Sequence, residues 1–260
     1  MENNINNNLL INNENTIIFT IGRMNPPTTG HMILIRNMIE LALKQNLKQI
    51  NIILSATIDN KTNPISCGEK RFFLLNFMIH HLKELMKLEN SSNIEKNTKI
   101  DEMQIKIICM NDYTNPNYGT HPIFKSIQYI LQDLYGYPRE DLKMILVIGA
   151  DRLANYEWIQ KSLLERTPPI NMEIVGLDRP EGAMSATYIR KLATDSNFEQ
   201  FKNEMLLTGL DEQHITELYN EIKNKIIPKR KKGGKKTRRK LNIYKRSKYC
   251  NKSRKYKNKK

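Results

Sequence analysis

The chain has 260 residues, a length that accommodates one or two domains, and 39% of its residues are hydrophobic, enough for one sizeable core. The longest apolar run, from Met144 to Ala150, falls well short of the roughly 18 residues of a membrane span. The N-terminus shows no basic segment followed by an apolar one, so no secretory signal is predicted. We therefore expect an intracellular, cytoplasmic protein without a membrane span.

The net charge of +15 is concentrated at one end of the sequence. Residues 229–260 contain 18 Lys or Arg and no Asp or Glu, which leaves residues 1–228 with 24 basic and 27 acidic side chains, a net charge of −3. A tail of this kind repels itself, has little to bury and is expected to be disordered. Four interpretations stay open: non-specific binding of nucleic acid, a nuclear-import signal, binding to an anionic surface, or a merely solvated tail.

The cysteine content bears on the redox compartment and on metals. Cys67, Cys109 and Cys250 are odd in number and far apart, which argues against a disulfide framework and indicates a reducing compartment. No Cys/His pair has the spacing of zinc ligands, so no structural metal is predicted.

Strand-like and helix-like segments alternate after an Asn-rich leader, residues 1–15, that is expected to be disordered. The strand candidates are rich in Ile and Val and apolar on both faces: Thr16–Ile21, Gln49–Ser55, Ile105–Met110, Lys143–Ile148 and Asn171–Val175. The helix candidates are His31–Gln45, Gly68–Leu88, Pro122–Tyr135, Leu153–Leu164, Ala186–Thr194, Asn197–Leu207 and Glu212–Ile226. The polar segment Glu89–Glu102 is expected to be a surface loop.

This alternation predicts an α/β fold, a Rossmann-like, doubly wound parallel sheet of about five strands with a helical C-terminal extension. We expect one domain over residues 16–210, a C-terminal helix over 211–228 and then the basic tail. Ligands of such sheets bind at the carboxyl ends of the strands, near the point where the strand order reverses. The loops that follow the strands are therefore the places to look for chemistry.

The loop after the first strand, residues 22–31, has the composition of a phosphate site. Gly22 lets the chain turn sharply and a ligand approach closely, while Arg23 adds positive charge. Gly30 and His31 open a helix whose free N–H groups and dipole favour phosphate, and the histidine can donate a hydrogen bond to a phosphoryl oxygen.

The loop after the fifth strand has a similar composition. Ser185 is a good helix N-cap, and at a helix start the hydroxyls of Ser185 and Thr187 and the guanidinium of Arg190 can converge on phosphate oxygens. Taken alone, the segment favours the simpler interpretation of a capped surface helix.

These two loops carry a family resemblance. Thr28-Thr29-Gly30-His31 resembles the (H/T)xGH signature of the nucleotidyltransferase superfamily, and residues 184–190 resemble its second signature, ISSTxIR. The opening Gly-Arg-x-x-Pro of the first loop is similar to archaeal-type nicotinamide-mononucleotide (NMN) adenylyltransferases and their phage and large-virus relatives. The resemblance covers roughly residues 16–207.

Two other loops extend the resemblance to an acceptor site. Asn63 and Arg71 lie in a segment similar to the Asn-Pro-x-Ser/Thr and Gly-Glu-Arg motifs of the archaeal-type enzymes. Asp151 and Trp158 resemble a Gly-x-Asp and a following Trp that meet the acceptor's ribose and pyridine ring in bacterial-type enzymes. For Trp158 the alternative is simple packing of a helix on the sheet.

The resemblance implies transfer of a nucleoside monophosphate, with the acceptor phosphate attacking the α-phosphorus of a nucleoside triphosphate and pyrophosphate leaving. His31 and Thr28 would serve the α- and β-phosphates, and Arg190 and Ser185 the β/γ side. Gly22, Arg23, Gly30 and Thr187 would complete the nucleotide site. Mg²⁺ would accompany ATP, or another triphosphate, and keep mostly water ligands.

Three functions remain open at this stage. The first is an adenylyltransferase with ATP and, as favoured acceptor, NMN; the second is a cytidylyltransferase acting on another phosphorylated acceptor. The third is a catalytically idle nucleotide-binding module whose tail binds nucleic acid. The sequence leaves the acceptor and the oligomeric state undetermined.

Overall fold

A five-stranded sheet forms the centre of residues 1–228. The computed structural model describes residues 15–110, 112, 121–136, 142–178 and 180–226. All strand pairings are parallel, in the order β3-β2-β1-β4-β5. The strands are β1 (Thr16–Gly22), β2 (Gln49–Leu54), β3 (Gln104–Cys109), β4 (Lys143–Gly149) and β5 (Asn171–Leu177). The Rossmann-like α/β fold and its five strands are thus confirmed.

Alternate side chains of each strand enter two separate hydrophobic clusters, one on each face of the sheet. In β1, for example, Ile18 belongs to one cluster and Ile17 and Phe19 to the other. All three are fully buried. Burial on both faces explains why the strands are apolar throughout rather than alternating with polar residues.

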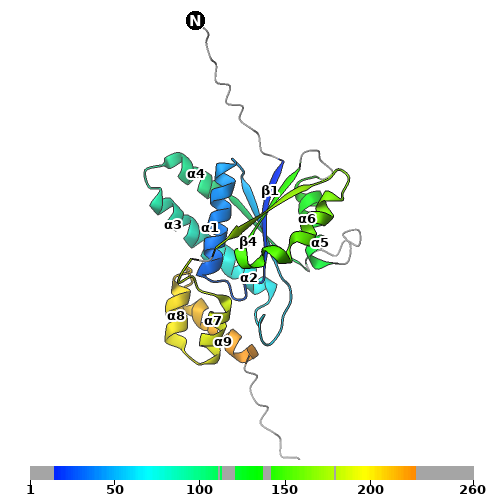
Figure 1. Cartoon of the computed structure of the whole chain (residues 1–260). Helices are drawn as coiled ribbons and strands as arrows, with labels where there is room; N and C mark the ends of the chain where they lie inside the picture. Colours follow the sequence, from blue (N-terminus) through cyan, green and yellow to red (C-terminus); the bar gives the residue numbers. More distant parts are fainter. Residues whose placement is uncertain (1–14, 111, 113–120, 137–141, 179, 227–260) are drawn as a thin grey trace, which may run out of the picture. The chain divides into compact units, whose positions relative to one another are not determined.

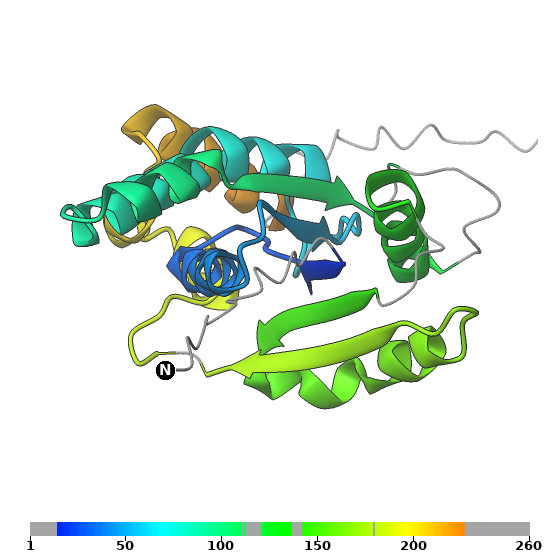
Figure 2. The same cartoon turned by 90° about the horizontal axis from the view of Figure 1, so that it is seen from above.

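Helices cover both faces of the sheet (Figures 1 and 2). One cluster includes buried residues of α1 (Thr29–Lys44), α2 (Cys67–Phe73), the π-helical turn η1 (Leu74–Met78), α3 (Ile79–Glu89) and α4 (Ile94–Glu102). The other includes residues of α5 (Pro122–Tyr129), the π-helical turn η3 (Ile130–Leu134) and α6 (Glu157–Leu164). A 3₁₀ segment, η4 (Ala150–Asn155), joins β4 to α6.

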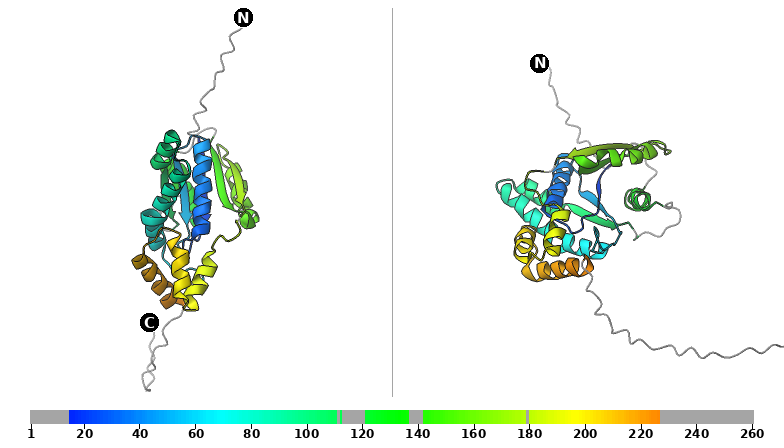
Figure 3. Two further views of the ribbon diagram at one scale, coloured as in Figure 1. Left: turned by 90° about the vertical axis from the view of Figure 1, so that its left-hand side faces the viewer. Right: turned by 60° about the horizontal axis from the view of Figure 1, so that its bottom comes forward.

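The last helices gather at one end of the domain (Figure 3). They are α7 (Ala186–Thr194), α8 (Phe198–Leu206) and α9 (Glu212–Ile226). Tyr219 of α9 packs edge-on against Phe198 and Phe201 of α8, and these helices share the hydrophobic cluster of α1 to α4. The start of α7 is thereby fixed close to the loop after β1.

Two expectations about helices need correction. The polar segment Glu89–Glu102 is not a loop throughout, because α4 occupies Ile94–Glu102 with Asn93 as its N-cap. Only Ile100 of α4 is buried, so most of the helix is solvated and its composition resembles that of a loop. The helix expected to begin at Leu153 instead begins at Glu157, after η4.

The expectation that the cysteines form no disulfide is wrong for one pair. Cys67 and Cys109 form a disulfide across a sequence separation of 42 residues, with their Cα atoms 6.0 Å apart. Because β3 lies next to β2, and α2 follows the loop after β2, the carboxyl end of β3 meets the start of α2. Sequence spacing contains no information about this proximity.

The chain divides into two units, residues 1–228 and 229–260. The leader, apart from Asn15, and the whole basic tail lie outside the described residues, so the expectation of disorder in both stays a prediction. Within the described residues, no helix has the length and apolar character needed to cross a membrane.

Two glycines with almost identical φ angles offer a test of the packing of the last helices on α3. Gly182 and Gly209 have φ of +82° and +83°, but a Cβ at Gly182 would meet nothing within 4 Å, whereas one at Gly209 would lie 2.4 Å from the Cβ of His81 in α3. Gly182→Ala should lower the free energy of unfolding by about 1 kcal/mol, the cost of a left-handed alanine. Gly209→Ala should lower it by about 1–3 kcal/mol more, because α8 and α3 must separate. Urea denaturation of both variants measures the difference, and equal losses would contradict the packing of Gly209 on α3.

Candidate functional site

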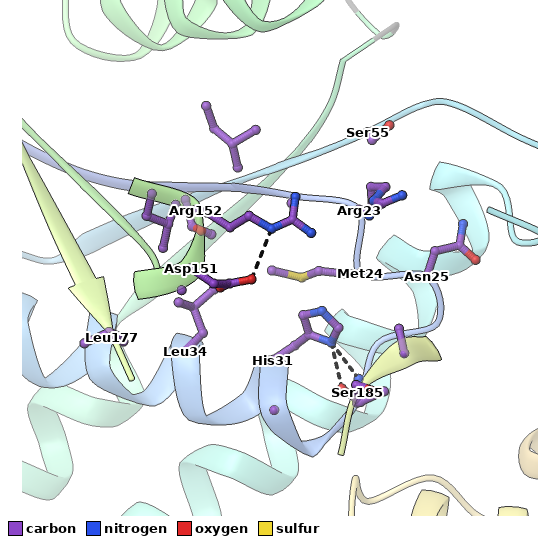
Figure 4. A pocket seen from close by; sticks show the side chains of 18 of the residues that line it. Arg23, Met24, Asn25, His31, Leu34, Ser55, Asp151, Arg152, Leu177 and Ser185 are labelled. Atoms are coloured by element: carbon purple, nitrogen blue, oxygen red, sulfur yellow. Dashed lines mark hydrogen bonds and ion pairs between the residues drawn. The ribbon is translucent and has the colours of Figure 1, made fainter. Parts of the chain in front are cut away.

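A cleft of about 530 Å³ opens at the carboxyl ends of β1 and β4, where the strand order reverses (Figure 4). Its volume lies in the range typical of small-molecule sites. Its walls come from the loop after β1, from η4 after β4, and from the segment between β5 and α7. The position is the one that open parallel sheets use for ligands.

The structure brings most of the proposed site residues to this cleft. Its lining includes the residues expected to bind the nucleotide and one expected to bind the acceptor: Gly22, Arg23, Thr28, Gly30, His31, Asp151, Ser185, Thr187 and Arg190. The loop after β1 and the start of α7 therefore contribute to one surface, although His31 and Ser185 are 154 residues apart in the sequence.

The imidazole of His31 is oriented by the helix start that carries it. The backbone N–H of Thr28, the N-cap of α1, donates to Nδ1 of His31 at 3.0 Å. Because a backbone N–H can only donate, Nδ1 of the neutral ring is an acceptor and the ring proton lies on Nε2. The ring of His31 thus lines the cleft with Nδ1 engaged by the helix start and its proton on Nε2.

The start of α1 is joined directly to the segment before α7. The hydroxyl of Thr28 donates to the carbonyl oxygen of Met184 at 2.9 Å. Gly30 lies so close to the same carbonyl that a Cβ would be 2.8 Å from the oxygen. Glycine is required here by a close backbone approach between the two signature segments.

Arg190 makes a second connection between these segments. Its guanidinium donates to the carbonyl oxygen of Asn25 and, at 3.1 Å, to the hydroxyl of Thr187. Burial and the nearby guanidinium of Arg23 lower the pKa of Arg190, and Asp59 opposes them. The guanidinium stays protonated because its ordinary pKa is so high, so it brings a partly desolvated positive charge to the cleft.

Ser185 caps α7 as expected from the sequence, its hydroxyl oxygen accepting from the N–H of Tyr188 at 3.1 Å. The N-terminus of α7 therefore faces the cleft beside the N-terminus of α1. Two helix starts at one cleft favour negatively charged ligands.

Lys70 supports the same loop, although the sequence did not single it out. Its side chain is fully buried, and Nζ donates to the carbonyl oxygens of Arg23, at 2.9 Å, and Ser55. Burial lowers the pKa of Lys70 from 10.5 to about 8. The sequence does contain a signal for its burial. Lys70 lies three residues from both Cys67 and Phe73, a spacing that places all three on the buried face of α2.

Asn25 was missed as well. Its side chain is 1% exposed and pairs with the backbone of Ile65, donating to the carbonyl oxygen at 2.7 Å and accepting from the N–H at 3.1 Å. The loops after β1 and β2 are thus held together much as neighbouring strands are.

Three proposed acceptor residues lie outside the cleft lining. The side-chain amide of Asn63 is buried and donates to the hydroxyl of Thr62, at 3.0 Å, and to Asp59. Arg71 pairs with Asp112 at 3.0 Å. Asn63 thus stabilises the loop after β2, and Arg71 pairs α2 with Asp112. Neither side chain lines the cleft.

Trp158 is the third of these residues. Its indole N–H donates to the carbonyl oxygen of Asn155 at 2.9 Å, and its ring meets those of His121 and Phe124 edge-on. The side chain is 38% exposed. In this arrangement Trp158 packs α6 against α5 and leaves ring stacking with a ligand unsupported.

Two comparisons of the sequence with known proteins found no match. No protein-family model matches the chain, and no curated protein matches its sequence. The described residues also contain no group of three or more His, Cys, Asp or Glu side chains arranged to hold a metal ion.

The contact at Gly30 can be tested with a matched pair of glycines. Gly30 and Gly68 are each the second residue of a helix, but a Cβ at Gly68 would approach only the hydroxyl of Ser66, at 4.0 Å. Gly68→Ala should raise the free energy of unfolding by up to about 1 kcal/mol through helix propensity. Gly30→Ala should lower it by about 1–3 kcal/mol, because α1 must move away from Met184. Chemical denaturation measures both, and stabilisation by Gly30→Ala would contradict the close approach.

Lys70 predicts a pH dependence of stability. Between about pH 8 and pH 10.5 the unfolded chain holds a proton on this lysine that the folded chain has lost, so stability rises with pH in this window. Relative to Lys70→Met, the wild type should gain up to about 3 kcal/mol across it. Denaturation curves from pH 7 to 10.5 measure the gain, with Lys61→Met, at an exposed position, as control. Parallel pH curves for wild type and Lys70→Met would contradict the lowered pKa.

Proposed function

We propose that this protein is a nucleotidyltransferase that transfers a nucleoside monophosphate, AMP from ATP in the first instance, to a small phosphorylated acceptor with release of pyrophosphate. The observation that carries the proposal is the convergence on one cleft of His31 and Arg190, which are 159 residues apart in the sequence. NMN is the favoured acceptor on the resemblance of the loop motifs.

The reaction requires positioning and charge stabilisation rather than an enzyme nucleophile. An oxygen of the acceptor phosphate attacks the α-phosphorus, the bond from that phosphorus to the α–β bridging oxygen breaks, and pyrophosphate leaves with the electron pair. Negative charge accumulates on the α-phosphate oxygens and on the leaving group. Donors already aimed at these positions lower the barrier because they need no reorganisation.

The side chains of the cleft match these requirements. Nε2–H of His31 can donate to an α-phosphate oxygen, since Nδ1 is held by the N-cap of α1. Arg190 retains guanidinium donors besides those bound to Asn25 and Thr187, and it can neutralise charge on the leaving pyrophosphate. Thr28 fixes the geometry between them through its bond to Met184.

Magnesium would enter with the triphosphate. Since the described residues offer no three-ligand cluster, Mg²⁺ would be held mainly by phosphate oxygens and water. Asp151 and Asp178 line the cleft and are the carboxylates there that could bind its water ligands. The chemistry that the ion supplies is neutralisation of charge on the triphosphate.

A screen of substrates separates the three candidate functions. Pyrophosphate release with ATP and NMN supports adenylyl transfer, and release only with CTP and another phosphomonoester supports cytidylyl transfer. Silence across a broad acceptor panel supports the nucleotide-binding module with a tail that binds nucleic acid.

A substitution at His31 tests the proposed mechanism most directly. His31→Asn keeps an acceptor near the position of Nδ1 for the N–H of Thr28 and removes Nε2–H, so the fold is preserved while the donor is lost. We expect kcat for pyrophosphate release to fall by at least about 10²-fold, the scale of losing one stabilising donor. His80→Ala, on the exposed face of α3, is the control and should retain wild-type kcat. A His31→Asn variant with a near-wild-type rate would remove His31 from the mechanism.

A further inference from the structure

Arg152 is a cationic residue of the cleft, separate from His31 and Arg190, which would bind the triphosphate. It lies in η4, directly after β4, and lines the cleft together with Arg23 and Tyr156. Its Nε lies 3.4 Å from Oδ2 of Asp151. Figure 4 shows the terminal nitrogens on the side away from Asp151, with Arg152 and Arg23 both across the cleft from His31. The carboxylate thus holds one edge of the guanidinium and leaves its other edge toward the cleft.

Three arginines from different segments line the cleft: Arg190 of α7, Arg23 of the loop after β1 and Arg152 of η4. Arg23 lies close enough to Arg190 to lower the pKa of that guanidinium, and Arg23 and Arg152 both act to lower the pKa of Tyr156, which burial raises. The charged residues of the lining are Arg23, Arg152 and Arg190, with Asp151 and Asp178 as the carboxylates. One of these carboxylates is already paired with Arg152. Guanidiniums that line one cleft repel one another, and an anion bound between them would offset this repulsion.

We propose that Arg152, together with Arg23, binds the phosphate group of the acceptor and orients it for attack on the α-phosphorus. The proposal deepens the nucleotidyltransferase function and rests on it for the identity of the nucleophile. The site would hold two anions, the triphosphate at His31 and Arg190 and the acceptor phosphate at Arg23 and Arg152. This moves Arg23 from the nucleotide site, where the family resemblance places it, to the acceptor site.

The in-line reaction explains why the cleft would need cations at two positions. Two anions must approach within bonding distance, and each repels the other until cations neutralise them. A planar guanidinium can bind two non-attacking phosphate oxygens at once and leave the third oxygen directed at the α-phosphorus. Met110, Ile123 and Ile148 also line the cleft and are apolar, so they can pack against the part of the acceptor beyond its phosphate.

The ion pair with Asp151 fits a positioning role for that carboxylate. A free arginine side chain loses considerable rotamer entropy on binding, and a partner on Nε reduces the loss by holding the guanidinium in place. Asp151 would then act through Arg152 rather than touch the acceptor directly, which differs from the role that the family resemblance implies for it.

The test compares Arg152→Gln with Lys161→Gln in the full-length chain. Both variants remove one positive charge, but Lys161 lies at an exposed position of α6 outside the cleft. Titration calorimetry measures the binding of ATP and of three phosphomonoesters, which are NMN, ribose 5-phosphate and glycerol 3-phosphate. The unphosphorylated counterpart of each phosphomonoester is titrated as a control. Steady-state pyrophosphate release gives KM for ATP and for the best acceptor.

We expect Arg152→Gln to raise the Kd and KM of the phosphomonoester by about tenfold to a hundredfold, the scale of one lost charged hydrogen-bonded contact. The Kd for ATP should change less than about threefold, Lys161→Gln should match the wild type, and Arg152→Lys should restore part of the acceptor affinity.

Several outcomes would overturn the proposal. They are an unchanged acceptor affinity in Arg152→Gln, an equal loss for ATP and acceptor, and a wild type that binds none of the phosphomonoesters. If the wild type binds a phosphomonoester but releases no pyrophosphate with any triphosphate, the proposed enzymatic function fails. The anion site is then judged by the calorimetry alone.

Discussion

The arrangement of the cleft depends on a set of hydrogen bonds that hold the loop after β1 from outside. The carbonyl oxygen of Arg23 accepts from the buried ammonium of Lys70, and that of Asn25 accepts from the guanidinium of Arg190. Met24, between them, has a φ of 42° and a side chain 2% exposed. A buried methionine in the left-handed region is unfavourable by itself, so its conformation must be maintained by the contacts on either side. The residues that surround the loop thus set the direction in which His31 and Arg23 face.

These contacts also connect the proposed chemistry to the architecture. Lys70 comes from α2, which follows β2, and Arg190 comes from α7, which follows β5. Both helices can reach the loop because the strand order places β1 in the centre of the sheet. The two cationic side chains that organise the loop are therefore supplied by opposite halves of the chain. Nucleotide binding would add a third set of contacts to the same loop, so we expect loop order and ligand affinity to be coupled.

Much of the fold could be predicted from local patterns. The strands were identifiable because burial on both faces makes runs such as Ile17–Ile18–Phe19 uniformly apolar, and the start of α7 because Ser185 is a good N-cap. The helix α4 was missed because a helix with one buried residue has the composition of a loop. The Cys67–Cys109 pair was missed because it depends on strand order, which spacing along the chain does not encode. Asn63 was assigned to the acceptor site by motif, yet its amide stabilises its own turn.

The central claim is that one nucleoside triphosphate binds between the starts of α1 and α7. A crystal structure of the protein with a non-hydrolysable ATP analogue tests it most directly. The account predicts Nε2 of His31 and the guanidinium of Arg190 within about 2.7–3.1 Å of phosphate oxygens of the same nucleotide. A nucleotide bound elsewhere, or one that meets only one of these two side chains, would contradict it.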